Sequence, residues 1–262
     1  MNLPPSDRTF VFIGGLHRSG TTLLARCLGE HPDASGFVDT GAMEDEGQFL
    51  QSIYPVAQRY GGPGLFGFAP EMHVTEDSPM ITDANRRQLY AEWSRYWDVG
   101  RSALIEKSPP NLLKTRFLQA MFPNTRFVMV MRHPIATSFA TQKWSHTSLA
   151  SLIRHWLVCN ETMLADLVHL KHVTILRYED FVSRGDDELM RVHEFIGLEP
   201  TSSGLEPRTG LNEAYFARWQ ALGQLPIRAH YRRRIERQYE ARVNRFGYSL
   251  RNPELLVDRV DA

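Results

Sequence analysis

The sequence has 262 residues, of which 42% are hydrophobic and 23% are charged, a balance typical of a soluble globular protein with a substantial core. Lysine plus arginine and aspartate plus glutamate number 30 each, so no overall charge favours nucleic acid or an anionic membrane as a partner. The two cysteines, Cys27 and Cys159, are too few for a disulfide framework and lack the spacing of metal ligands. We therefore expect a single domain over residues 1–262, with no nucleic-acid partner and no metal.

The first residues carry no sign of export. Residues 1–7 are polar and contain proline, whereas a signal peptide has a basic region followed by an apolar one. No stretch approaches eighteen continuous apolar residues, so no membrane-spanning segment is expected. We predict a cytoplasmic location, with residues 1–9 flexible.

Residues 10–24 combine a short apolar strand, a glycine-containing turn and the start of a helix. Backbone N–H groups in such a turn converge on one point, and together with the positive end of the helix dipole they bind an anion. The spacing from Gly15 to Gly20 is that of a Walker A loop, but Thr21 occupies the position of its lysine. With Arg18 as the nearest cation, the loop suits a terminal 5′-phosphoryl-type group better than a nucleoside triphosphate. The alternative is an ordinary strand-to-helix turn.

A turn-rich stretch dense in carboxylates, residues 34–48, follows this helix. A general base must lie within hydrogen-bond reach of the proton that it removes, so acids that follow a phosphate loop are candidates. The other interpretation, an exposed acidic helix start, stays open for each of them. The four acids are Asp39, Glu44, Asp45 and Glu46.

Residues 60–80 contain the run Gly-Gly-Pro-Gly, which cannot continue a helix. Long loops in compact domains are often functional, so this one is a candidate cover for a binding pocket, anchored by Phe66 and Phe68. The alternative is a surface loop that the two rings hold in place.

Two buried strands, residues 103–107 and 126–131, end directly at basic side chains. Lys107 is the last residue of the first strand, and Arg132 follows the second. Ligands of α/β proteins collect at the carboxyl ends of the strands, so both side chains are placed for chemistry, and Arg132 could bind a phosphate by a bidentate contact. The alternatives are a solvated charge for Lys107 and a structural salt bridge for Arg132.

The remaining pattern predicts further helices and one more strand. The helices are expected over 82–98, 149–170, 186–196 and 227–246, and the strand over 172–178. The last helix should pack on the body through a stripe formed by Ile227, Tyr231, Ile235, Tyr239 and Val243. Its outer face is rich in arginine, which indicates either a solvated surface or a site for an acidic partner.

The run Arg-Ser-Gly-Thr-Thr from Arg18 to Thr22, the strand ending in Arg132 and the strand ending in Tyr178-Glu179 together resemble the sulfotransferases that use 3′-phosphoadenosine 5′-phosphosulfate. Among these enzymes the tyrosylprotein sulfotransferases look closest. The resemblance covers roughly residues 10–250. It implies an α/β, P-loop-type fold with a central, mostly parallel β-sheet flanked by helices, in agreement with the alternating strands and helices.

The resemblance also implies roles for individual residues. The phosphate loop would hold the 5′-phosphosulfate group, Arg132 would hold the 3′-phosphate, and Lys107 would lie beside the bridging oxygen. The donor-binding residues that it implies are His17, Arg18, Ser19, Gly20, Thr21, Thr22, Arg132, Tyr178, Asn212 and Arg218.

This sequence departs from the family pattern at two places. The serine usually found eight residues beyond the 3′-phosphate arginine is Ala140, for which Ser138 or Thr141 could substitute. Ungapped comparison from Arg18 puts Asp39 at the position of the catalytic glutamate, whereas a modest loop insertion selects Glu44 or Glu46. We favour Glu46, because it opens a predicted helix and a carboxylate in a first turn can point inward.

The expected function is transfer of a sulfuryl group from this donor to an acceptor hydroxyl, in line and without a metal. The acceptor would be a small molecule, a glycan or a lipid, and residues 60–80 would cover its site. One alternative is a kinase-like phosphotransferase that uses ATP and Mg²⁺, although the missing loop lysine counts against it. The other is a non-catalytic nucleotide-binding module.

Overall fold

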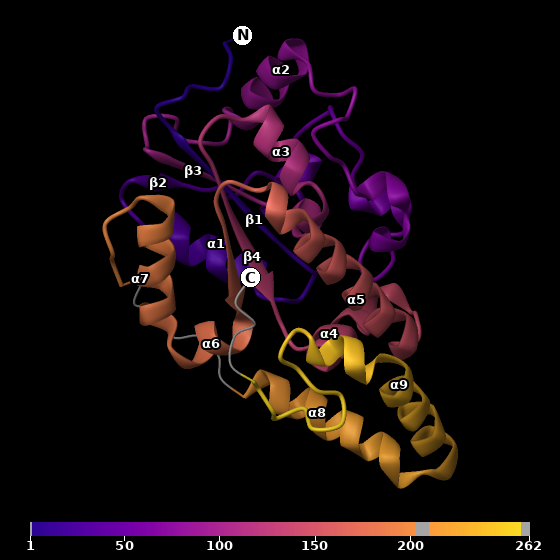
Figure 1. Cartoon of the computed structure of the whole chain (residues 1–262). Coiled ribbons are helices and arrows are strands. Elements are labelled where there is room, and N and C mark those ends of the chain that lie inside the picture. The colour runs from indigo at the N-terminus through magenta and orange to yellow at the C-terminus, as the bar shows by residue number, and fades with distance from the viewer. Residues whose placement is uncertain (1, 203–209, 258–262) are drawn as a thin grey trace.

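Five parallel strands form one sheet at the centre of the computed structural model, which describes residues 2–202 and 210–257 (Figure 1). The strands are β1 (Thr9–Gly15), β2 (Ala34–Ser35), β3 (Ala103–Lys107), β4 (Thr125–Met131) and β5 (Val173–Arg177). Their order across the sheet is β2-β3-β1-β4-β5, with parallel pairing at each step. The predicted α/β fold with a mostly parallel sheet is confirmed.

Helices cover both faces of this sheet. The α-helices are α1 (Thr21–Gly29), α2 (Asp83–Trp93), α3 (Thr115–Met121), α4 (Pro134–Ser145), α5 (Leu149–Asp166), α6 (Tyr178–Ser183), α7 (Gly185–Ile196), α8 (Leu211–Ala221) and α9 (Pro226–Asn244). One face packs against α1 and α7, and the other packs against α2, α3 and α5. No helix in the described ranges is both long enough and apolar enough to cross a membrane.

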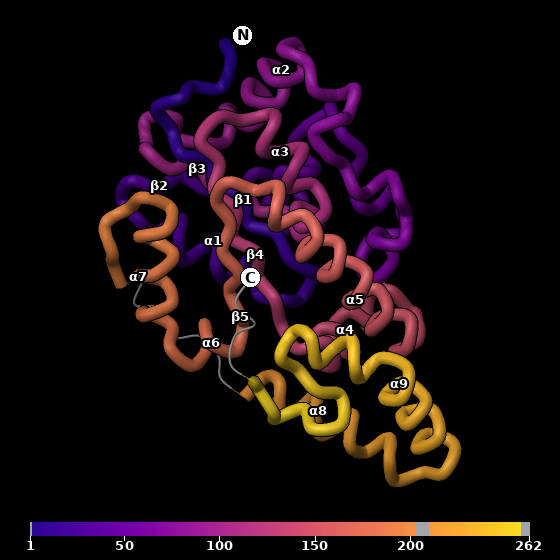
Figure 2. Tube along the Cα trace, viewed as in Figure 1, coloured from indigo at the N-terminus to yellow at the C-terminus, as the bar shows by residue number. Residues whose placement is uncertain are grey.

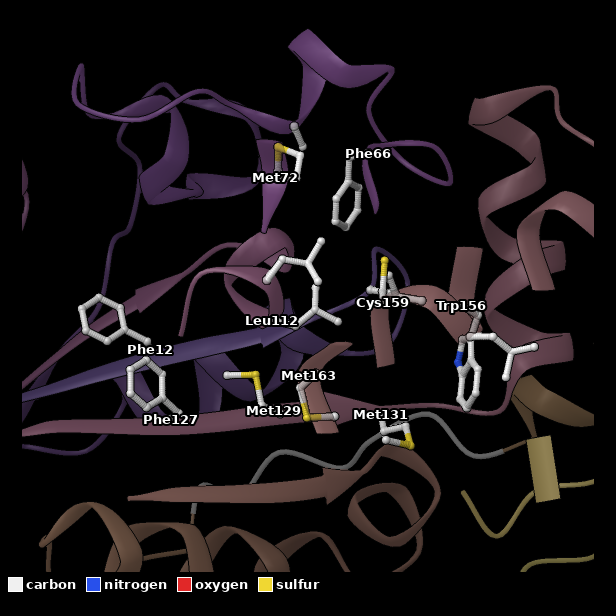
Figure 3. Close-up of a cluster of buried hydrophobic side chains, with 14 of the residues drawn as sticks. Phe12, Phe66, Met72, Leu112, Phe127, Met129, Met131, Trp156, Cys159 and Met163 are labelled. Carbon is white, nitrogen blue, oxygen red and sulfur yellow. The ribbon is translucent and has the colours of Figure 1, made fainter. Parts of the chain in front are cut away.

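The alternation of side chains along β1 explains the two-layered core. Phe10 and Phe12 point to one face of the sheet, and Val11 and Ile13 point to the other, and all four are fully buried. The larger cluster lies on the phenylalanine side, where methionines of β4 and α5 pack beside aromatic rings (Figure 3). Both faces of β1 are therefore covered, as its continuous apolar run predicts.

Two predicted helices are shorter than the periodicity indicates. The helix expected over 82–98 ends at Trp93, where the Ser94 hydroxyl donates to the Tyr90 carbonyl at 2.6 Å. Trp97 is buried outside the helix and its Nε1 donates to the Ile105 carbonyl at 2.8 Å, so its core position has a tertiary cause. Likewise, the helix expected over 149–170 ends at Asp166 and is followed by a 3-10 turn.

The last helix packs on the body through only part of its predicted stripe. Ile235, Tyr239 and Val243 are buried, whereas the side chain of Ile227 is 86% exposed, contrary to its prediction. Figure 2 gives the reason, because α8 and α9 form a hairpin that projects from the body and Ile227 lies in the first turn of α9.

Parts of residues 1–9 and of residues 60–80 pack against the rest of the protein. Met1 lies outside the described residues, but within 1–9 Pro4 is buried and Thr9 already belongs to β1, paired with Ala103. In residues 60–80, Phe66 is fully buried, with its ring 5.6 Å from that of His17 and 4.8 Å from that of His155. This segment therefore rests on the phosphate loop and on α5.

Candidate active site

The candidate residues meet at one edge of the sheet because the strands that carry them are parallel. In the strand register, Ile13 pairs with Lys107 and Gly15 pairs with Val130, so the phosphate loop, Lys107 and Arg132 leave the sheet at similar levels. Strand β5 ends beside them and passes directly into Tyr178. The sequence-based expectation of a shared carboxyl edge agrees with this geometry.

Two glycines allow the phosphate loop its shape. A Cβ atom on Gly15 would lie 2.5 Å from the Val130 carbonyl oxygen and 2.7 Å from Ser19 Oγ. Gly20 has a φ of 105°, and a Cβ atom there would lie 2.6 Å from the ring of Tyr178. Helix α1 begins at the next residue and has no acidic side chain in its first turn, so its N–H groups and dipole remain suited to an anion.

Four buried polar atoms in or beside this loop have no hydrogen-bond partner within the described residues. They are His17 Nδ1, Ser19 Oγ, Arg132 Nη2 and Ser138 Oγ. Buried polar groups are nearly always hydrogen-bonded in folded proteins, so these atoms are candidates to bind a polar ligand. Ser19 Oγ is a hydroxyl and Arg132 Nη2 is a guanidinium nitrogen, and both suit an anionic oxygen. His17 and Ser138 line one small cavity.

Arg132 is held firmly by three other elements. Its Nε donates to Asn212 Oδ1 at 2.8 Å, and its Nη1 donates to the Arg18 carbonyl at 2.9 Å. The guanidinium carbon lies 4.2 Å above the ring centre of Tyr178. Burial lowers the pKa of Arg132, although it stays cationic because guanidinium groups do not lose their proton in proteins. Asn212 also donates to Glu179 at 2.7 Å, which fixes its amide.

Arg18 and Arg218, the other two cations predicted to bind the donor, are both exposed. The Arg18 backbone has a φ of 70°, and its side chain is exposed with the guanidinium 4.9 Å from the ring centre of Trp144. Arg218 is also exposed, with its guanidinium 4.5 Å from the ring centre of Phe139. Phe139 and Trp144 both belong to α4, so this helix carries both contacts.

The two candidate substitutes for the missing serine do not face Arg132. Thr141 Oγ1 donates to the His17 carbonyl at 3.4 Å, and Ser138 lines the same small cavity as His17 and Thr141. Ser138 and Thr141 are three residues apart on α4 and therefore share a helix face, which is turned toward the phosphate loop. Ala140 is buried and offers no polar atom in its side chain.

Among the three candidate bases, the structure brings Glu46 to Lys107. Lys107 Nζ lies 3.6 Å from Glu46 Oε1, and both side chains are 5% exposed. Burial raises the pKa of Glu46 above its ordinary value, although the Lys107 cation opposes this shift. Asp39 and Glu44 are both exposed, and Glu44 contributes only its carbonyl, which accepts from Lys107 Nζ at 2.7 Å.

The local structure around Glu46 differs from the predicted helix start. Glu46 precedes a 3-10 helix, η2 (Gly47–Phe49), rather than a longer α-helix. The Gln48 amide donates to Glu46 Oε2 at 2.5 Å and so helps to orient the carboxylate. The remaining acid, Asp45, accepts from the backbone and hydroxyl of Thr40 at 2.8 and 2.7 Å, which gives it a structural role.

Two cavities of about 360 Å³ each are lined by predicted site residues. The first lies between α1 and residues 36–45, and its lining includes Thr22, Asp39 and Lys107 but no residue of 60–80. The second includes Tyr178 and Asn212 in its lining. One cavity therefore contacts Lys107, and the other contacts two of the predicted donor-binding residues.

Sequence reasoning missed the buried polar residues behind Lys107 and Glu46. Glu106 is fully buried, and Gln48, Ser108 and Asn111 are at most 2% exposed. The signal that could have found them is Glu106 itself, because an acid inside an apolar strand requires partners. Among the residues that the structure describes, no group of three or more histidine, cysteine, aspartate or glutamate side chains is arranged to hold a metal.

Comparison with known proteins agrees with the resemblance seen in the sequence. Residues 11–202 match the family model described as the sulfotransferase family. The nodulation protein NoeE of Sinorhizobium fredii is 26% identical over 216 residues, which cover 72% of this chain and 50% of that protein. Protein-tyrosine sulfotransferase 2 of Gallus gallus is 23% identical over 202 residues, covering 73% and 52% respectively. The chain therefore spans about half the length of the curated relatives that it matches.

A solved structure supports the fold. The sulfotransferase domain of the Synechococcus PCC 7002 olefin synthase aligns with a TM-score of 0.53 at 19% identity, covering 80% of this chain and 79% of that one. At this level of identity, the likeness speaks for the architecture and not for the substrate.

Proposed function

Because the chain belongs to the sulfotransferase family, we propose that it transfers a sulfuryl group from 3′-phosphoadenosine 5′-phosphosulfate to an acceptor hydroxyl. The observation that carries this proposal is the buried pair of Glu46 and Lys107, 3.6 Å apart at the edge of the sheet that also carries the phosphate loop. A carboxylate able to take a proton and a cation able to stabilise a leaving phosphate are the two groups that such a transfer needs.

The donor would bind through both of its phosphate-bearing ends. The 5′ end suits the phosphate loop from His17 to Thr22, with Ser19 Oγ as a donor, and the 3′-phosphate suits Arg132 Nη2. Arg218 lies on the neighbouring α8 and would add charge from the solvent side. Tyr178, beneath Gly20, would complete the site beside the cavity that it lines with Asn212.

Glu46 and Lys107 would each have one role in the transfer step. The acceptor oxygen forms a bond to sulfur while the bond from sulfur to the phosphate oxygen breaks, and 3′-phosphoadenosine 5′-phosphate leaves. Glu46 would take the proton of the acceptor hydroxyl, and Lys107 would stabilise the charge that develops on the leaving phosphate. Glu46 is preferred over Asp39 and Glu44 because only Glu46 places a carboxylate oxygen within 4 Å of Lys107 Nζ among the described residues.

The acceptor would enter by the cavity between α1 and residues 36–45, because Lys107 lines it. A volume of about 360 Å³ suits a small molecule or the end of a glycan or lipid. Its lining includes Glu30, Asp39 and Glu44 but only Arg26 and Lys107 as cations, so a neutral hydroxyl-bearing acceptor fits better than an anionic one. A cytoplasmic location stays a prediction.

Calorimetry with 3′-phosphoadenosine 5′-phosphate and with ATP tests the donor. We expect tight binding of the former and none of the latter, followed by sulfuryl transfer in an acceptor screen that EDTA does not inhibit. ATP binding with EDTA-sensitive phosphoryl transfer would replace the proposal by the phosphotransferase. Binding of the bisphosphate without transfer to any acceptor of a broad panel would favour the non-catalytic module.

A further inference from the structure

Glu106 is a fully buried acid in the middle of the sheet. It precedes Lys107 on β3, and its side chain points to the opposite face of the strand. A buried carboxylate is costly unless it is hydrogen-bonded, so its partners show what it stabilises.

Three close neighbours surround this carboxylate. The Ser108 hydroxyl donates to Oε1 and the Asn111 amide donates to Oε2, both at 2.5 Å. Gly47 packs so closely that a Cβ atom there would lie 2.5 Å from Glu106 Cγ and Oε1. Glu106 therefore contacts both the segment that follows β3 and the turn that contains Glu46.

The first branch of this network leads to the candidate base. Ser108 Oγ accepts from the Gln48 backbone N–H at 2.9 Å. The Gln48 side chain donates to Glu46 Oε2 at 2.5 Å, and its Oε1 accepts from the Ala57 N–H at 2.9 Å. The hydrogen bond from Gln48 therefore orients Glu46, and the hydrogen bond to Ser108 fixes Gln48.

The second branch leads to the phosphate loop. Asn111 Nδ2 also donates to the Ile13 carbonyl at 3.1 Å, and the Ser108 N–H donates to the same oxygen at 3.2 Å. Ile13 directly precedes the two glycines of the loop. A Cβ atom on Gly14 would lie 2.7 Å from the Leu112 nitrogen, so this contact is also close in the backbone.

We propose that Glu106 is a positioning residue that, through Ser108 and Asn111, holds Glu46 opposite Lys107 and fixes both relative to the phosphate loop. This inference rests on the proposed sulfuryl transfer. Glu106 touches neither the cavity beside Lys107 nor the unpartnered anion-binding atoms, so it acts through its neighbours.

The ionised form of Glu106 is the one that fits these contacts, because both of its oxygens accept hydrogen bonds. Burial raises the pKa of Glu106 to about 7. The charged or titratable groups that act on it are Lys107 and Glu46 at the site, and Lys114 and Tyr54 on the other side. A proton on one oxygen would turn an acceptor into a donor that faces Ser108 or Asn111, so positioning should weaken below about pH 7.

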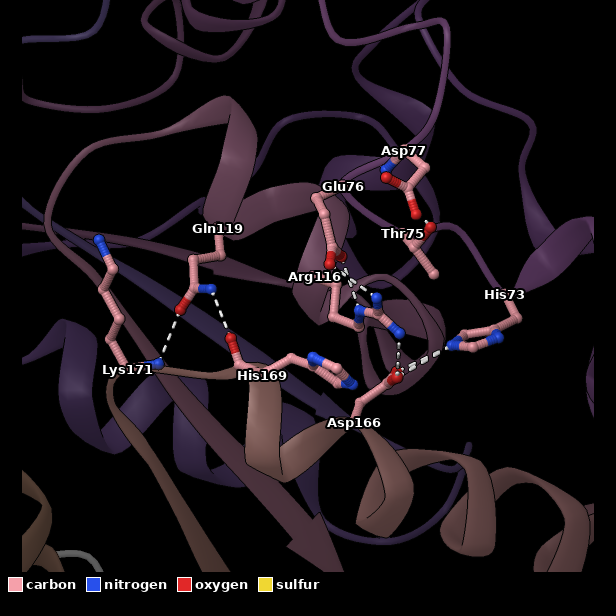
Figure 4. Close-up of polar contacts among 9 residues, drawn as sticks. All are labelled: His73, Thr75, Glu76, Asp77, Arg116, Gln119, Asp166, His169 and Lys171. Atoms are coloured by element: carbon pink, nitrogen blue, oxygen red, sulfur yellow. Dashed lines mark hydrogen bonds and ion pairs between the residues drawn. The ribbon is translucent and has the colours of Figure 1, made fainter.

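The test compares Glu106→Gln and Ser108→Ala with a matched control, Asp166→Asn. Asp166 is another buried carboxylate, which accepts from His73 and Arg116 at the end of α5 (Figure 4). That cluster lies near the amino ends of the strands, because α5 leads toward the start of β5. Ser108→Ala interrupts the link to Gln48 without changing any charge.

We expect both network variants to lose kcat by roughly 10- to 100-fold while the Kd for 3′-phosphoadenosine 5′-phosphate changes less than about threefold. Asp166→Asn should lower thermal stability and leave kcat within about twofold. Unchanged kcat in both folded network variants would overturn the proposal, as would an equal loss in Asp166→Asn.

The pH profile separates positioning from mere structural support. Wild-type kcat should show an inflection near pH 7 that Glu106→Gln lacks. Burial also lowers the pKa of Lys114 to about 7, so Lys114→Met is the control and should retain the inflection. An inflection that persists in Glu106→Gln, or that disappears in Lys114→Met, counts against the role of Glu106.

A readout without turnover keeps this inference separate from the proposed function. Lys107 lines a cavity that admits small reagents, so its acetylation by acetic anhydride at pH 8.5 can be followed by mass spectrometry. Lys107 should be acetylated faster in Glu106→Gln and Ser108→Ala than in wild type, because both substitutions weaken the ion pair between Lys107 and Glu46. If wild type transfers no sulfuryl group, the proposed function fails, and the labelling result still decides whether Glu106 positions Lys107.

Discussion

The carboxylate of Glu46 and the amine of Lys107 lie 3.6 Å apart in a buried pair, although one follows a turn and the other ends a strand. Burial favours the protonated form of Glu46, and the neighbouring cation favours the ionised form. These opposing effects leave a carboxylate that is more basic than an exposed one. Such a group suits the removal of a proton from an acceptor hydroxyl.

The pH dependence of turnover follows from this pair. A general base works only when ionised, so kcat should fall as the pH drops through the raised pKa of Glu46. Glu46→Gln should cost roughly 10²- to 10⁴-fold in kcat and abolish this acid limb. Steady-state kinetics between pH 4 and 9 measure both effects. Asp39→Asn is the control, because Asp39 is exposed, and an equal loss in that variant would move the base to Asp39.

Lys107→Ala should separate binding from chemistry. The variant removes the cation expected beside the leaving phosphate, so kcat should fall about a hundredfold or more. Because the backbone N–H groups and Arg132 remain, the Kd for 3′-phosphoadenosine 5′-phosphate should change far less. Calorimetry and single-turnover kinetics on one preparation give the two numbers. Normal turnover in Lys107→Ala would remove the lysine from the mechanism.

The parts of the site that lie at strand ends were predictable from the sequence. Strand 103–107 was predicted with the observed bounds, because an apolar run stops at two prolines. Lys107 and Arg132 come together because parallel strands end on one edge, which is a property of the fold and needs no knowledge of side-chain packing. Only the pattern of strands and helices had to be recognised.

The choice among Asp39, Glu44 and Glu46 depends on structure that periodicity does not encode. Asp39, Glu44 and Asp45 all have positive φ angles near 50°, so the chain turns sharply and repeatedly before Glu46. Single residues in this left-handed conformation leave no regular pattern in the sequence. The bonds of Gln48 and Ser108 that orient Glu46 are tertiary contacts, and these are also invisible in a single sequence.

Arg132→Lys tests the 3′-phosphate site. Lysine keeps the charge but lacks the planar fork with which Arg132 holds Asn212 and the Arg18 carbonyl at 2.8 and 2.9 Å. Affinity for 3′-phosphoadenosine 5′-phosphate should fall roughly 10- to 100-fold, as expected for a charge-assisted bond. Adenosine 5′-phosphate, which lacks the 3′-phosphate, is the control ligand and should lose much less. Equal losses for both nucleotides would mean that Arg132 acts through the shape of the loop.

Gly67→Ala tests how tightly residues 60–80 are fixed to α5. A Cβ atom on Gly67 would overlap Cys159 Sγ and would lie 3.0 Å from His155 Nε2, which accepts from the Gly67 N–H at 3.0 Å. The substitution must displace the segment, the helix or the side chains of Cys159 and His155, all in a buried environment, so we expect a loss of about 1–3 kcal/mol in the free energy of unfolding.

Urea denaturation measures this loss against a control of the same chemistry, Gly29→Ala. Gly29 is the last residue of α1, and a Cβ atom there would meet no described atom within 4 Å apart from its chain neighbours and the backbone of its own helix, so alanine should be neutral or stabilising by up to about 1 kcal/mol. The double variant Gly67→Ala/Cys159→Ala should recover part of the loss, because it removes the sulfur atom that the new methyl group meets. Equal stability of Gly67→Ala and wild type would mean that the segment or the Cys159 side chain shifts at little cost, and would contradict tight fixation of the segment to α5.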